Sequence, residues 1–337
     1  MRASVLREHG DNSKFKIETD FPDPTCPEDG VVVAVKATSL NYHDIFTRRG
    51  MPGITLDFPI IAGLDVAGEI AEVGAHVQGW SVGDAVLIDP RNRVEHKLVG
   101  ETMAGGLADY CACPAHQLVS IPEGVSYAQA ASLPVAYGTA HRMMITRGQV
   151  CAEDIVLILG ASGGVGTGAL LLAKMMGAET VVCSSSQEKL RKLKDLGADH
   201  GINYLEDDFV KKIWEMYTKP HRREYKGGVT MAINFTGGDT WTKCMRVLRR
   251  GGKMLTCGAT AGYDPKTDLR YIWSFEFDIL GSNSWEPDDL TSLLGYIAEG
   301  KMTVPIDKSY GLEEVPEAMR VIEEREVFGK IIIDPTL

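Results

Sequence analysis

The chain has 337 residues, which is long enough for two domains and a large apolar core. Apolar residues make up 44% of it and charged residues 24%, as in ordinary globular proteins, while a formal net charge of −11 argues against nucleic acids and anionic membranes as partners. Seven scattered cysteines without a Cys-x-x-Cys pair, and an amino terminus without an apolar signal core, predict a reduced protein of the cytoplasm.

The first part of the chain is rich in strands and turns. β-Branched residues bounded by Gly, Pro or Asp predict strands at Val31–Leu40, Asp65–Gly74 and Ala85–Ile88. From about Ser126 the sequence becomes rich in alanine, which indicates helix. We therefore expect a first, β-rich domain over residues 1–125.

Strands and helices alternate through the middle of the chain. Strands are predicted at Val156–Leu159, Thr180–Ser185, His200–Tyr204, Val229–Gly238, Gly252–Ala259 and Phe277–Ser284, with helices at Gly166–Met176, Gln187–Gly197 and Asp207–Tyr217. This alternation predicts an α/β domain with a doubly wound parallel sheet over residues 126–283. The mixed tail, residues 284–337, is expected to return to the first domain.

A glycine turn follows the first strand of this middle domain. It reads Ala161-Ser162-Gly163-Gly164-Val165-Gly166. Gly163 would let the backbone approach a pyrophosphate, Gly166 would let the helix pack close to the strand, and the helix N-terminus would stabilise the phosphates. The turn therefore predicts a dinucleotide site, with helix–sheet packing alone as the alternative.

The next strand indicates which dinucleotide binds. A free ribose 2′-hydroxyl usually meets Asp or Glu at the end of this strand, but the chain has Ser184 and Ser185 there, followed by Lys189. Serine hydroxyls can donate to a 2′-phosphate and Lys189 can neutralise it, which favours NADPH over NADH. A solvated helix face is the alternative explanation for the basic residues, above all for Arg191.

These motifs together resemble the medium-chain dehydrogenase/reductase superfamily over nearly the whole chain. The matching segments are GLDVAGEIAEVG, GDAVL, GLADYCACPA, IPEGVSYAQAASLP, the glycine turn, KDLGADHGINY, RRGGKMLTCGA and FGKIII. The resemblance implies a GroES-like catalytic domain, a Rossmann domain, and a C-terminal segment that completes the former. It also implies that nicotinamide and substrate bind in a cleft between the domains.

The residues that hold zinc in the alcohol dehydrogenases of this superfamily are replaced here. Asn41 stands at the position of a cysteine ligand, Leu64 at that of a histidine, and Val135 near the third position. Leucine cannot coordinate zinc. The stretch that carries the structural zinc in relatives has no cysteine here, and the histidines lack close ligand spacing. We therefore expect no metal and assign the chain to the zinc-free quinone oxidoreductase-like branch.

Relatives also imply further cofactor contacts. Lys189 and Tyr204 match positions that contact the 2′-phosphate, and Arg325 and Lys330 are candidates near the C-terminus. On the nicotinamide side the candidates are Phe235, Gly258, Ala259 and Ser282, which follow strands of the parallel sheet. A homodimer or a higher homo-oligomer is expected in the same way, through pairing of the segment Phe277–Asn283 with its copy.

Without zinc, a conjugated acceptor is favoured, because hydride addition to an enone or quinone gives a delocalised anion that hydrogen bonds can stabilise. The candidate catalytic residues are Asn41, Tyr42, His43 and Tyr137. His43 takes the place of a proton-relay hydroxyl. Each has a structural alternative: Asn41 could hold a loop, His43 could be a surface histidine, and Tyr42 could face the core if the strand continues through it.

Enoyl thioester reductases of the superfamily carry a tyrosine acid in a segment that here reads Gly50-Met51-Pro52-Gly53. Its absence weakens the thioester interpretation and leaves the proton donor open, water included. The predicted function is NADPH-dependent hydride transfer to a small-molecule quinone or α,β-unsaturated carbonyl compound. A zinc-free alcohol or ketone dehydrogenase and a non-catalytic NADPH-binding protein remain alternatives.

Overall fold

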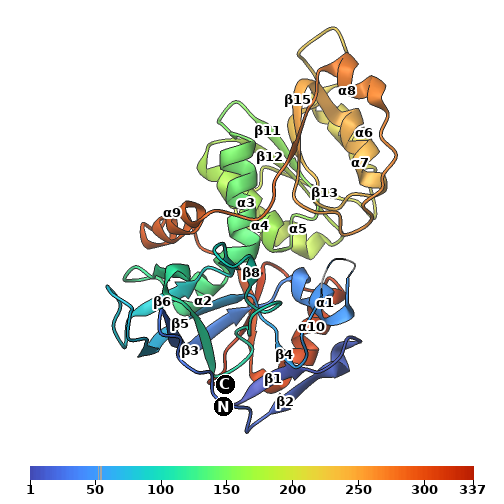
Figure 1. Ribbon diagram of the computed structural model, residues 1–337. Coiled ribbons are helices and arrows are strands. Elements are labelled where there is room, and N and C mark those ends of the chain that lie inside the picture. Colours follow the sequence, from blue (N-terminus) through green and yellow to red (C-terminus); the bar gives the residue numbers. More distant parts are fainter. Residues whose placement is uncertain (52, 54) are drawn as a thin grey trace. The chain divides into compact units, whose positions relative to one another are not determined.

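The computed structural model describes residues 1–51, 53 and 55–337. These residues form two compact units (Figure 1). Unit 1 comprises Met1–Ala136 and Glu286–Leu337, and unit 2 comprises Tyr137–Trp285. Within the described ranges, every helix is too short or too polar to traverse a lipid bilayer.

Unit 1 is built on two main sheets and a separate two-stranded sheet of β7 and β8. The larger has the order β10-β6-β5-β3-β18-β17, with β9 also paired to β3, and the smaller has the order β2-β1-β4. The strands are β1 (Ala3–Leu6), β2 (Phe15–Glu18), β3 (Gly30–Ser39), β4 (Ile60–Ile61), β5 (Asp65–Val73), β6 (Ala85–Ile88), β7 (Arg91–Asn92), β8 (Lys97–Leu98), β9 (Tyr110–Pro114), β10 (Leu118–Ser120), β17 (Ile306–Tyr310) and β18 (Lys330–Ile333). The helices are α1 (Tyr42–Arg49), α2 (Tyr127–Ala131), α9 (Pro287–Ala298) and α10 (Val315–Glu323).

Strand register in unit 1 gathers distant polar residues. Strand β3 pairs antiparallel with β5, which sets Ser39 opposite Asp65, and with β18, which sets Ser39 opposite Ile332. Lys330 opens β18 and Asn41 follows β3. The ends of three strands therefore bring Ser39, Asn41, Asp65 and Lys330 to one place.

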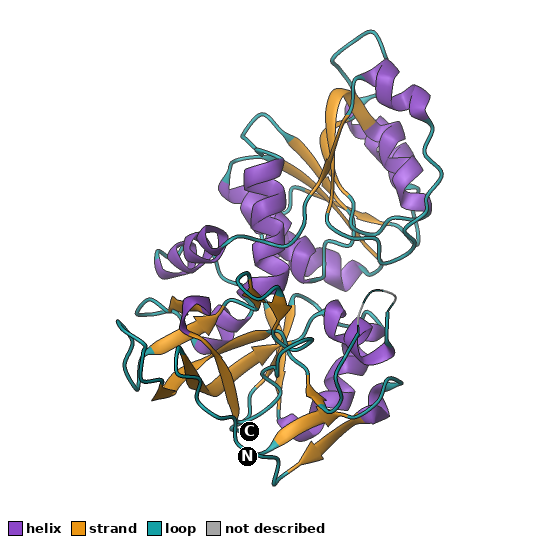
Figure 2. Ribbon diagram, in the orientation of Figure 1, coloured by secondary structure: helices purple, strands orange, loops and turns teal. Residues whose placement is uncertain are grey.

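Unit 2 contains the parallel sheet predicted from the sequence. Its order is β13-β12-β11-β14-β15-β16, and all five pairings are parallel. The strands are β11 (Ile155–Ile158), β12 (Glu179–Ser184), β13 (His200–Asn203), β14 (Val229–Ile233), β15 (Leu248–Thr256) and β16 (Asp278–Gly281). The helices are α3 (Thr139–His141), α4 (Gly164–Met175), α5 (Gln187–Asp195), α6 (Phe209–Tyr217), α7 (Asp239–Val247) and α8 (Leu269–Phe275), and Figure 2 shows helices on both faces of the sheet. The strand order reverses beside β11, the kind of point at which such sheets bind ligands.

The change from unit 1 to unit 2 falls later than residues 125/126, where the change in composition places it. Helix α2 stays with unit 1, because the Gln129 side chain pairs with both backbone groups of Val304, at 2.9 and 2.8 Å. The Val135 N–H donates to Asp65 of the same unit at 3.0 Å. The chain returns to unit 1 at Glu286.

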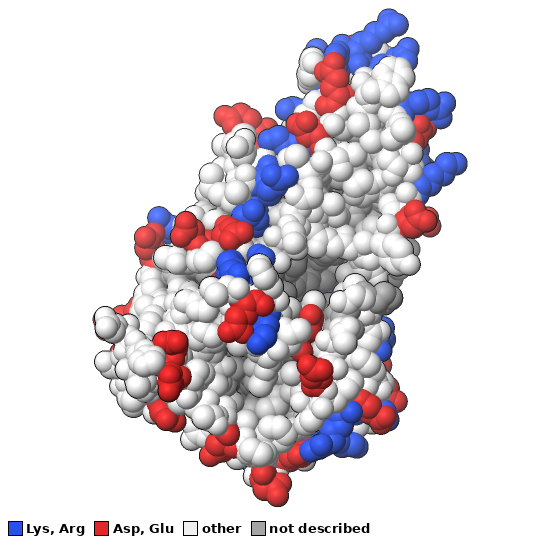
Figure 3. Space-filling model, in the orientation of Figure 1, with Lys and Arg blue, Asp and Glu red and all other residues white. Residues whose placement is uncertain are grey.

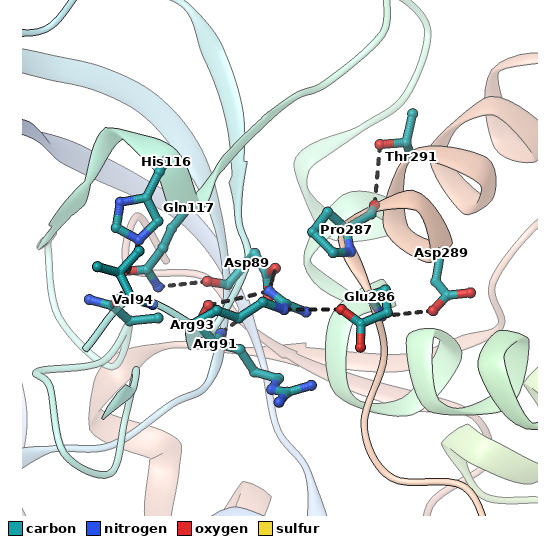
Figure 4. A network of polar contacts seen from close by, with 11 residues as sticks. Asp89, Arg91, Arg93, Val94, His116, Gln117, Glu286, Pro287, Asp289 and Thr291 are labelled. Carbon is teal, nitrogen blue, oxygen red and sulfur yellow. Dashed lines mark hydrogen bonds and ion pairs between the residues drawn. The ribbon is translucent and has the colours of Figure 1, made fainter. Parts of the chain in front are cut away.

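A polar network holds the returning segment within unit 1 (Figure 4). The Arg93 guanidinium lies between Asp89 and Glu286, to which it donates, the latter at 3.3 Å. The Glu286 N–H donates to Asp289 at 2.7 Å and so closes the first turn of α9. On the face shown in Figure 3, acidic and basic side chains are interspersed, as is usual for the solvent-exposed surface of a protein.

Candidate active site

The glycine turn of unit 2 has the geometry of a phosphate-binding turn. Gly160 adopts a φ of +62°, and Gly163 precedes the first turn of α4. A Cβ on Gly166 would lie 2.4 Å from the Gly160 carbonyl oxygen, whereas one on Gly163 would meet nothing closer than 3.8 Å. Gly166 therefore lets the helix pack against the turn, and Gly163 leaves open space beside the helix N-terminus, where an anion is stabilised.

Ser184 lies where the second strand of the sheet ends. Its hydroxyl is buried and has no hydrogen-bond partner among the described residues. A buried hydroxyl without a partner is uncommon and calls for a missing group. The Ser184 carbonyl accepts from the Tyr204 N–H at 3.1 Å, so the structure brings these two predicted residues together, with Tyr204 exposed. Ser185 and Lys189 follow on the loop and first turn of α5.

The other predicted cofactor residues of unit 2 also follow strand ends. Phe235 comes after β14 and its ring edge would lie 3.2 Å from a Cβ on Gly160, so it borders the glycine turn. Gly258 and Ala259 follow β15, and Ser282 follows β16. The Ser282 hydroxyl, like that of Ser184, is buried without a partner in the described part of the chain. The residues present in unit 2 therefore fit a dinucleotide.

In unit 1, the strand ends hold a buried charged cluster of Ser39, Asn41, Asp65 and Lys330, which we call the lysine cluster. Asp65 accepts from the Ser39 hydroxyl and the Asn41 amide, both at 2.8 Å, and from the Val135 N–H. The Lys330 ammonium donates to the Leu40 carbonyl at 2.9 Å and lies 3.6 Å from Asp65. A carboxylate that accepts three hydrogen bonds is the ionised form, and Lys330 balances its charge.

Burial dominates the ionisation of this cluster. Burial raises the pKa of Asp65, although the charge of Lys330 acts to lower it. Burial also lowers the pKa of Lys330, although the charge of Asp65 acts to raise it. Burial likewise raises the pKa of Asp44 to about 6. Asp44 accepts from the backbone N–H groups of Asn41, at 2.8 Å, and Gly63, at 3.1 Å. It thus fixes the start of α1 to the segment before Asp65.

Strand β3 ends at Ser39, and Tyr42 opens helix α1 and packs against the core of unit 1. Asn41 and Asp44 form an N-terminal cap, in which the third helical residue accepts from the backbone of the capping residue. The Tyr42 ring packs edge-on against Phe46, one turn further along the helix. Tyr42 and His43 therefore leave the same helical turn in different directions.

His43 pairs with a carboxylate that the sequence did not single out. Its Nε2 lies 2.6 Å from the carboxylate of Glu101, on the turn after β8. Burial lowers the pKa of His43, but the hydrogen bond to Glu101 and the nearby charges of Asp44, Glu101 and Asp65 outweigh this effect. The pKa of His43 is therefore raised. No local pattern marks Glu101, which is 58 residues away along the chain.

The positions that hold zinc in the alcohol dehydrogenases carry groups that do not suit a metal ion. Asn41 and the Val135 N–H both donate to Asp65, and the Leu64 side chain is buried and apolar. Residues 1–51, 53 and 55–337 contain no group of three or more His, Cys, Asp or Glu side chains that could hold a metal ion. The residues present therefore do not fit the zinc of the alcohol dehydrogenases.

The structure also defines the surroundings of three other candidate residues. Tyr137 is fully buried in unit 2, where its phenol bonds the Thr167 hydroxyl at 2.9 Å. Arg325 is exposed on the turn after α10, and Lys330 is committed to the lysine cluster, both in unit 1. Pro52, in the segment where thioester reductases carry a tyrosine, is outside the described residues.

Comparison with known proteins identifies the two units. Residues 27–123 match the family model described as the alcohol dehydrogenase GroES-like domain, and residues 164–299 match the one described as zinc-binding dehydrogenase. A 2-methylene-furan-3-one reductase from Solanum lycopersicum is 30% identical, over 99% of this chain and 79% of the relative. An acryloyl-coenzyme A reductase from Sulfurisphaera tokodaii is 29% identical, over 99% of this chain and 100% of the relative.

Solved structures agree over the whole chain. An NAD-dependent alcohol dehydrogenase superposes with a TM-score of 0.91 at 30% identity, covering 99% of both chains. The quinone oxidoreductase from Coxiella burnetii gives 0.80 at 26% identity, also covering 99% of both chains. A 2-octenoyl-CoA carboxylase reductase in complex with NADP and 2-octenoyl-CoA gives 0.86 at 26% identity, covering 99% of this chain and 87% of that one.

The chain therefore belongs to the medium-chain dehydrogenase/reductase superfamily, and within it to the quinone oxidoreductase-like branch. The predicted combination of a GroES-like domain with a Rossmann domain is confirmed.

Proposed function

We propose that the protein is an NADPH-dependent, zinc-independent reductase that reduces an α,β-unsaturated carbonyl compound or a quinone. The proposal rests on the groups found at the zinc-ligand positions. These are the Asn41 amide, which is hydrogen-bonded to Asp65, the buried side chain of Leu64 and the backbone N–H of Val135. These groups cannot hold a metal cation that would polarise an isolated carbonyl. A conjugated acceptor needs less help, because its reduced form spreads the negative charge.

The cofactor assignment rests on unit 2. NADPH, when bound, supplies the hydride. The glycine turn of residues 161–166 would hold its pyrophosphate, and Ser184, Ser185, Lys189 and Tyr204 would surround the 2′-phosphate. The unpartnered Ser184 hydroxyl supports this assignment, since a 2′-phosphate oxygen would satisfy it. Phe235, Gly258, Ala259 and Ser282 remain the proposed neighbours of the nicotinamide.

The acceptor class is supported by the names of the relatives. The tomato relative is a methylene-furanone reductase, the archaeal relative reduces acryloyl-coenzyme A, and the structure with NADP also holds an enoyl thioester. Each of these compounds carries a carbon–carbon double bond conjugated to a carbonyl. The similarity to an NAD-dependent alcohol dehydrogenase keeps saturated ketones and alcohols as the competing class.

The residues of unit 1 would handle the proton. His43 has a raised pKa and a ring that is one-third exposed, so it can deliver a proton to the reduced substrate at neutral pH. Asn41 is less suited to this role, because its amide oxygen accepts from Lys330 and its amide nitrogen donates to Asp65. We assign Asn41 to holding the helix start that presents His43.

A substrate panel tests the proposal directly. NADPH oxidation is followed at 340 nm with an enone, a quinone, an enoyl thioester, a saturated ketone and, in reverse, an alcohol. Turnover with at least one conjugated acceptor, unchanged by a chelator, supports the proposal. Turnover only with ketones or alcohols, or stoichiometric zinc in the purified protein, contradicts it. Tight NADPH binding without any turnover indicates a binding protein.

Substitution of Ser184 tests the cofactor. Ser184→Asp places a carboxylate beside the proposed 2′-phosphate, so kcat/KM for NADPH should fall by about 10- to 100-fold and the preference should move towards NADH. Ser184→Ala is the matched control, because it removes the hydroxyl without adding charge. An unchanged preference in Ser184→Asp would show that the 2′-phosphate lies elsewhere.

We further propose a cytoplasmic homodimer. Each of the seven cysteines is a free thiol, which suits a reducing compartment. Strand β16 ends the order of the six-stranded sheet, and pairing with its copy would extend that sheet across a two-fold axis. Sedimentation analysis of the purified protein tests the dimer, and a monomer at micromolar concentration would contradict it.

A further inference from the structure

The contact between His43 and Glu101 has the geometry of a catalytic dyad. The two side chains meet at 2.6 Å, which is a short contact for a hydrogen bond between an imidazole and a carboxylate. Glu101 is the more buried partner, with 16% of its side chain exposed, against 33% for His43. The carboxylate is therefore held inside, while part of the imidazole ring stays open to solvent and small molecules.

Backbone packing fixes the turn that presents Glu101. The N–H groups of Glu101, Thr102 and Met103 all donate to the Leu98 carbonyl, at 3.2, 2.9 and 3.0 Å. Gly100 adopts a φ of +78°, and a Cβ there would lie 2.9 to 3.0 Å from the backbone of Gly63. The turn thus rests directly on the segment that leads into Asp65, which leaves Glu101 little freedom to move.

The other end of the contact is fixed equally well. His43 is the second residue of α1, whose start is capped by Asn41 and Asp44. Asp44 in turn accepts from the Gly63 N–H. The helix that carries His43 and the turn that carries Glu101 therefore both contact the backbone of Gly63. The relative position of His43 and Glu101 is thus set before any ligand binds.

The chemistry of the contact decides which nitrogen of His43 can exchange a proton. An ionised carboxylate only accepts, so Nε2 must carry the hydrogen that points to Glu101. Among the described residues, Nδ1 has no hydrogen-bond partner. The neutral ring then has a lone pair on Nδ1, and protonation of the ring adds its proton there.

We propose that Glu101 is a positioning residue for His43, which holds the imidazole as its Nε2–H tautomer and leaves Nδ1 as the atom that gives a proton to the substrate. This inference rests on the proposed function. In the reaction, hydride adds to the β-carbon of the conjugated carbonyl, and the electron pair of the double bond moves onto the enolate. The Nδ1 proton of His43 then goes to the enolate, and the neutral ring regains a proton from solvent.

The charged groups that face His43 are Glu101, Asp44 and Asp65, all acidic. Replacement of Glu101 therefore removes one of three stabilising charges. In Glu101→Gln the side-chain amide oxygen can still accept from Nε2–H, but its charge is gone. In Glu101→Ala both the acceptor and the charge are lost.

Nitrogen-15 NMR of histidine-labelled protein tests the inference without turnover. The His43 signals are assigned by their loss in His43→Gln. We expect the Nε2–H tautomer above the pKa in the wild type and in Glu101→Gln, and a mixture of tautomers in Glu101→Ala. The pKa of His43 should fall by about one pH unit in Glu101→Gln. Glu95→Gln, in the β7–β8 connection just before this turn and paired with Lys97, is the control and should leave both unchanged.

The pH dependence of kcat/KM supplies the second readout. Loss of the acid form should begin about one pH unit lower in Glu101→Gln, with an approximately tenfold lower rate at pH 8, and Glu101→Asp should restore part of it. An Nδ1–H tautomer in the wild type, or an unchanged tautomer and pH profile in Glu101→Ala, would overturn the inference. Absence of turnover in the wild type would instead refute the proposed function, while the NMR result would still decide whether Glu101 fixes the ring.

Discussion

The ammonium of Lys330 lies 2.6 Å from the amide oxygen of Asn41, and the two residues are 289 positions apart. Strand β18 inserts Lys330 beside the end of β3, where the zinc enzymes of the superfamily have their first ligand. A fixed organic cation thus neutralises Asp65 within the fold. Its position, bonded to Leu40 and Asn41, serves to hold the start of α1 and so to orient His43.

Removal of this cation should be costly. Lys330→Met keeps most of the length of the side chain but leaves the Asp65 carboxylate buried without a counter-charge, so the unfolding free energy should fall by about 3–5 kcal/mol. Urea unfolding measures the change. The double variant Lys330→Met/Asp65→Asn should recover part of it, and Lys301→Met, at an exposed pair with Glu299, should change stability by less than about 0.5 kcal/mol. Equal losses in the two single lysine variants would show that the cluster does not stabilise the fold.

Asp44 should give the stability a characteristic pH dependence. Burial raises its folded pKa to about 6 from an ordinary value of 3.8, so the folded protein keeps a proton that the unfolded chain releases between these values. Asp44 should therefore contribute a fall in the unfolding free energy, of up to about 3 kcal/mol, as pH rises from about 4 to 6. In Asp44→Asn this fall should be missing. Parallel stability curves for the two proteins would contradict the raised pKa.

Alanine substitutions at Gly163 and Gly166 should have different effects, one mainly on cofactor binding and the other mainly on the stability of the fold. A Cβ on Gly163 meets no atom within 3.8 Å, so Gly163→Ala should keep its stability within about 1 kcal/mol and lose at least tenfold in NADPH affinity. Gly166→Ala places a methyl group 2.4 Å from the Gly160 oxygen and should cost about 1–3 kcal/mol of stability. Fluorescence titration and urea unfolding measure both properties. Unchanged NADPH binding in Gly163→Ala would place the pyrophosphate elsewhere.

Tyr137 should behave as a core residue. Tyr137→Phe removes a buried hydroxyl that bonds Thr167, which should cost about 0.5–1.5 kcal/mol of stability. The value of kcat/KM for the best acceptor should stay within about twofold. A loss of tenfold or more in kcat/KM, with the fold intact by circular dichroism, would restore the catalytic role that the sequence suggested.

Gly100 should affect the reaction through Glu101. Gly100→Ala forces a side chain into a positive φ and against the Gly63 backbone, so the turn must move and the pairing of Glu101 with His43 should weaken. Gly124→Ala is the matched control, since Gly124 has a φ of +86° but nothing within 4 Å of the added Cβ. We expect kcat/KM at pH 8 to fall about tenfold only in Gly100→Ala, measured at equal folded fraction. Similar values of kcat/KM in both variants would show that the position of this turn does not affect the reaction.

Much of the fold could be predicted from local patterns. The parallel sheet follows from apolar runs separated by amphipathic helices, and the glycine turn is found where the sequence places it. Helix α1 was not predicted, because Asn41 was considered at a zinc-ligand position and as a catalytic candidate, without its capping partner Asp44. The same pair of residues also satisfies the first backbone donors of a helix.

The candidate site was harder to predict, because its decisive contacts join distant segments. Glu101 carries no local signal, and its role depends on Gly100 packing against Gly63. Lys330 was predicted to contact the cofactor. The register of β18 against β3 instead places its ammonium where it donates a hydrogen bond to the Asn41 amide oxygen. Strand register of this kind is set by whole sheets, which a single sequence does not display.

The insertion of β18 between β3 and β17 also has a consequence for biosynthesis. All six strands of unit 2 leave the ribosome before Lys330 does, so that sheet can close while the sheet of unit 1 still lacks an inner strand. Until that moment Asp65 lacks its counter-charge, and the amide oxygen of Asn41 lacks the donor that Lys330 provides. The proton-handling half of the molecule is thus assembled last.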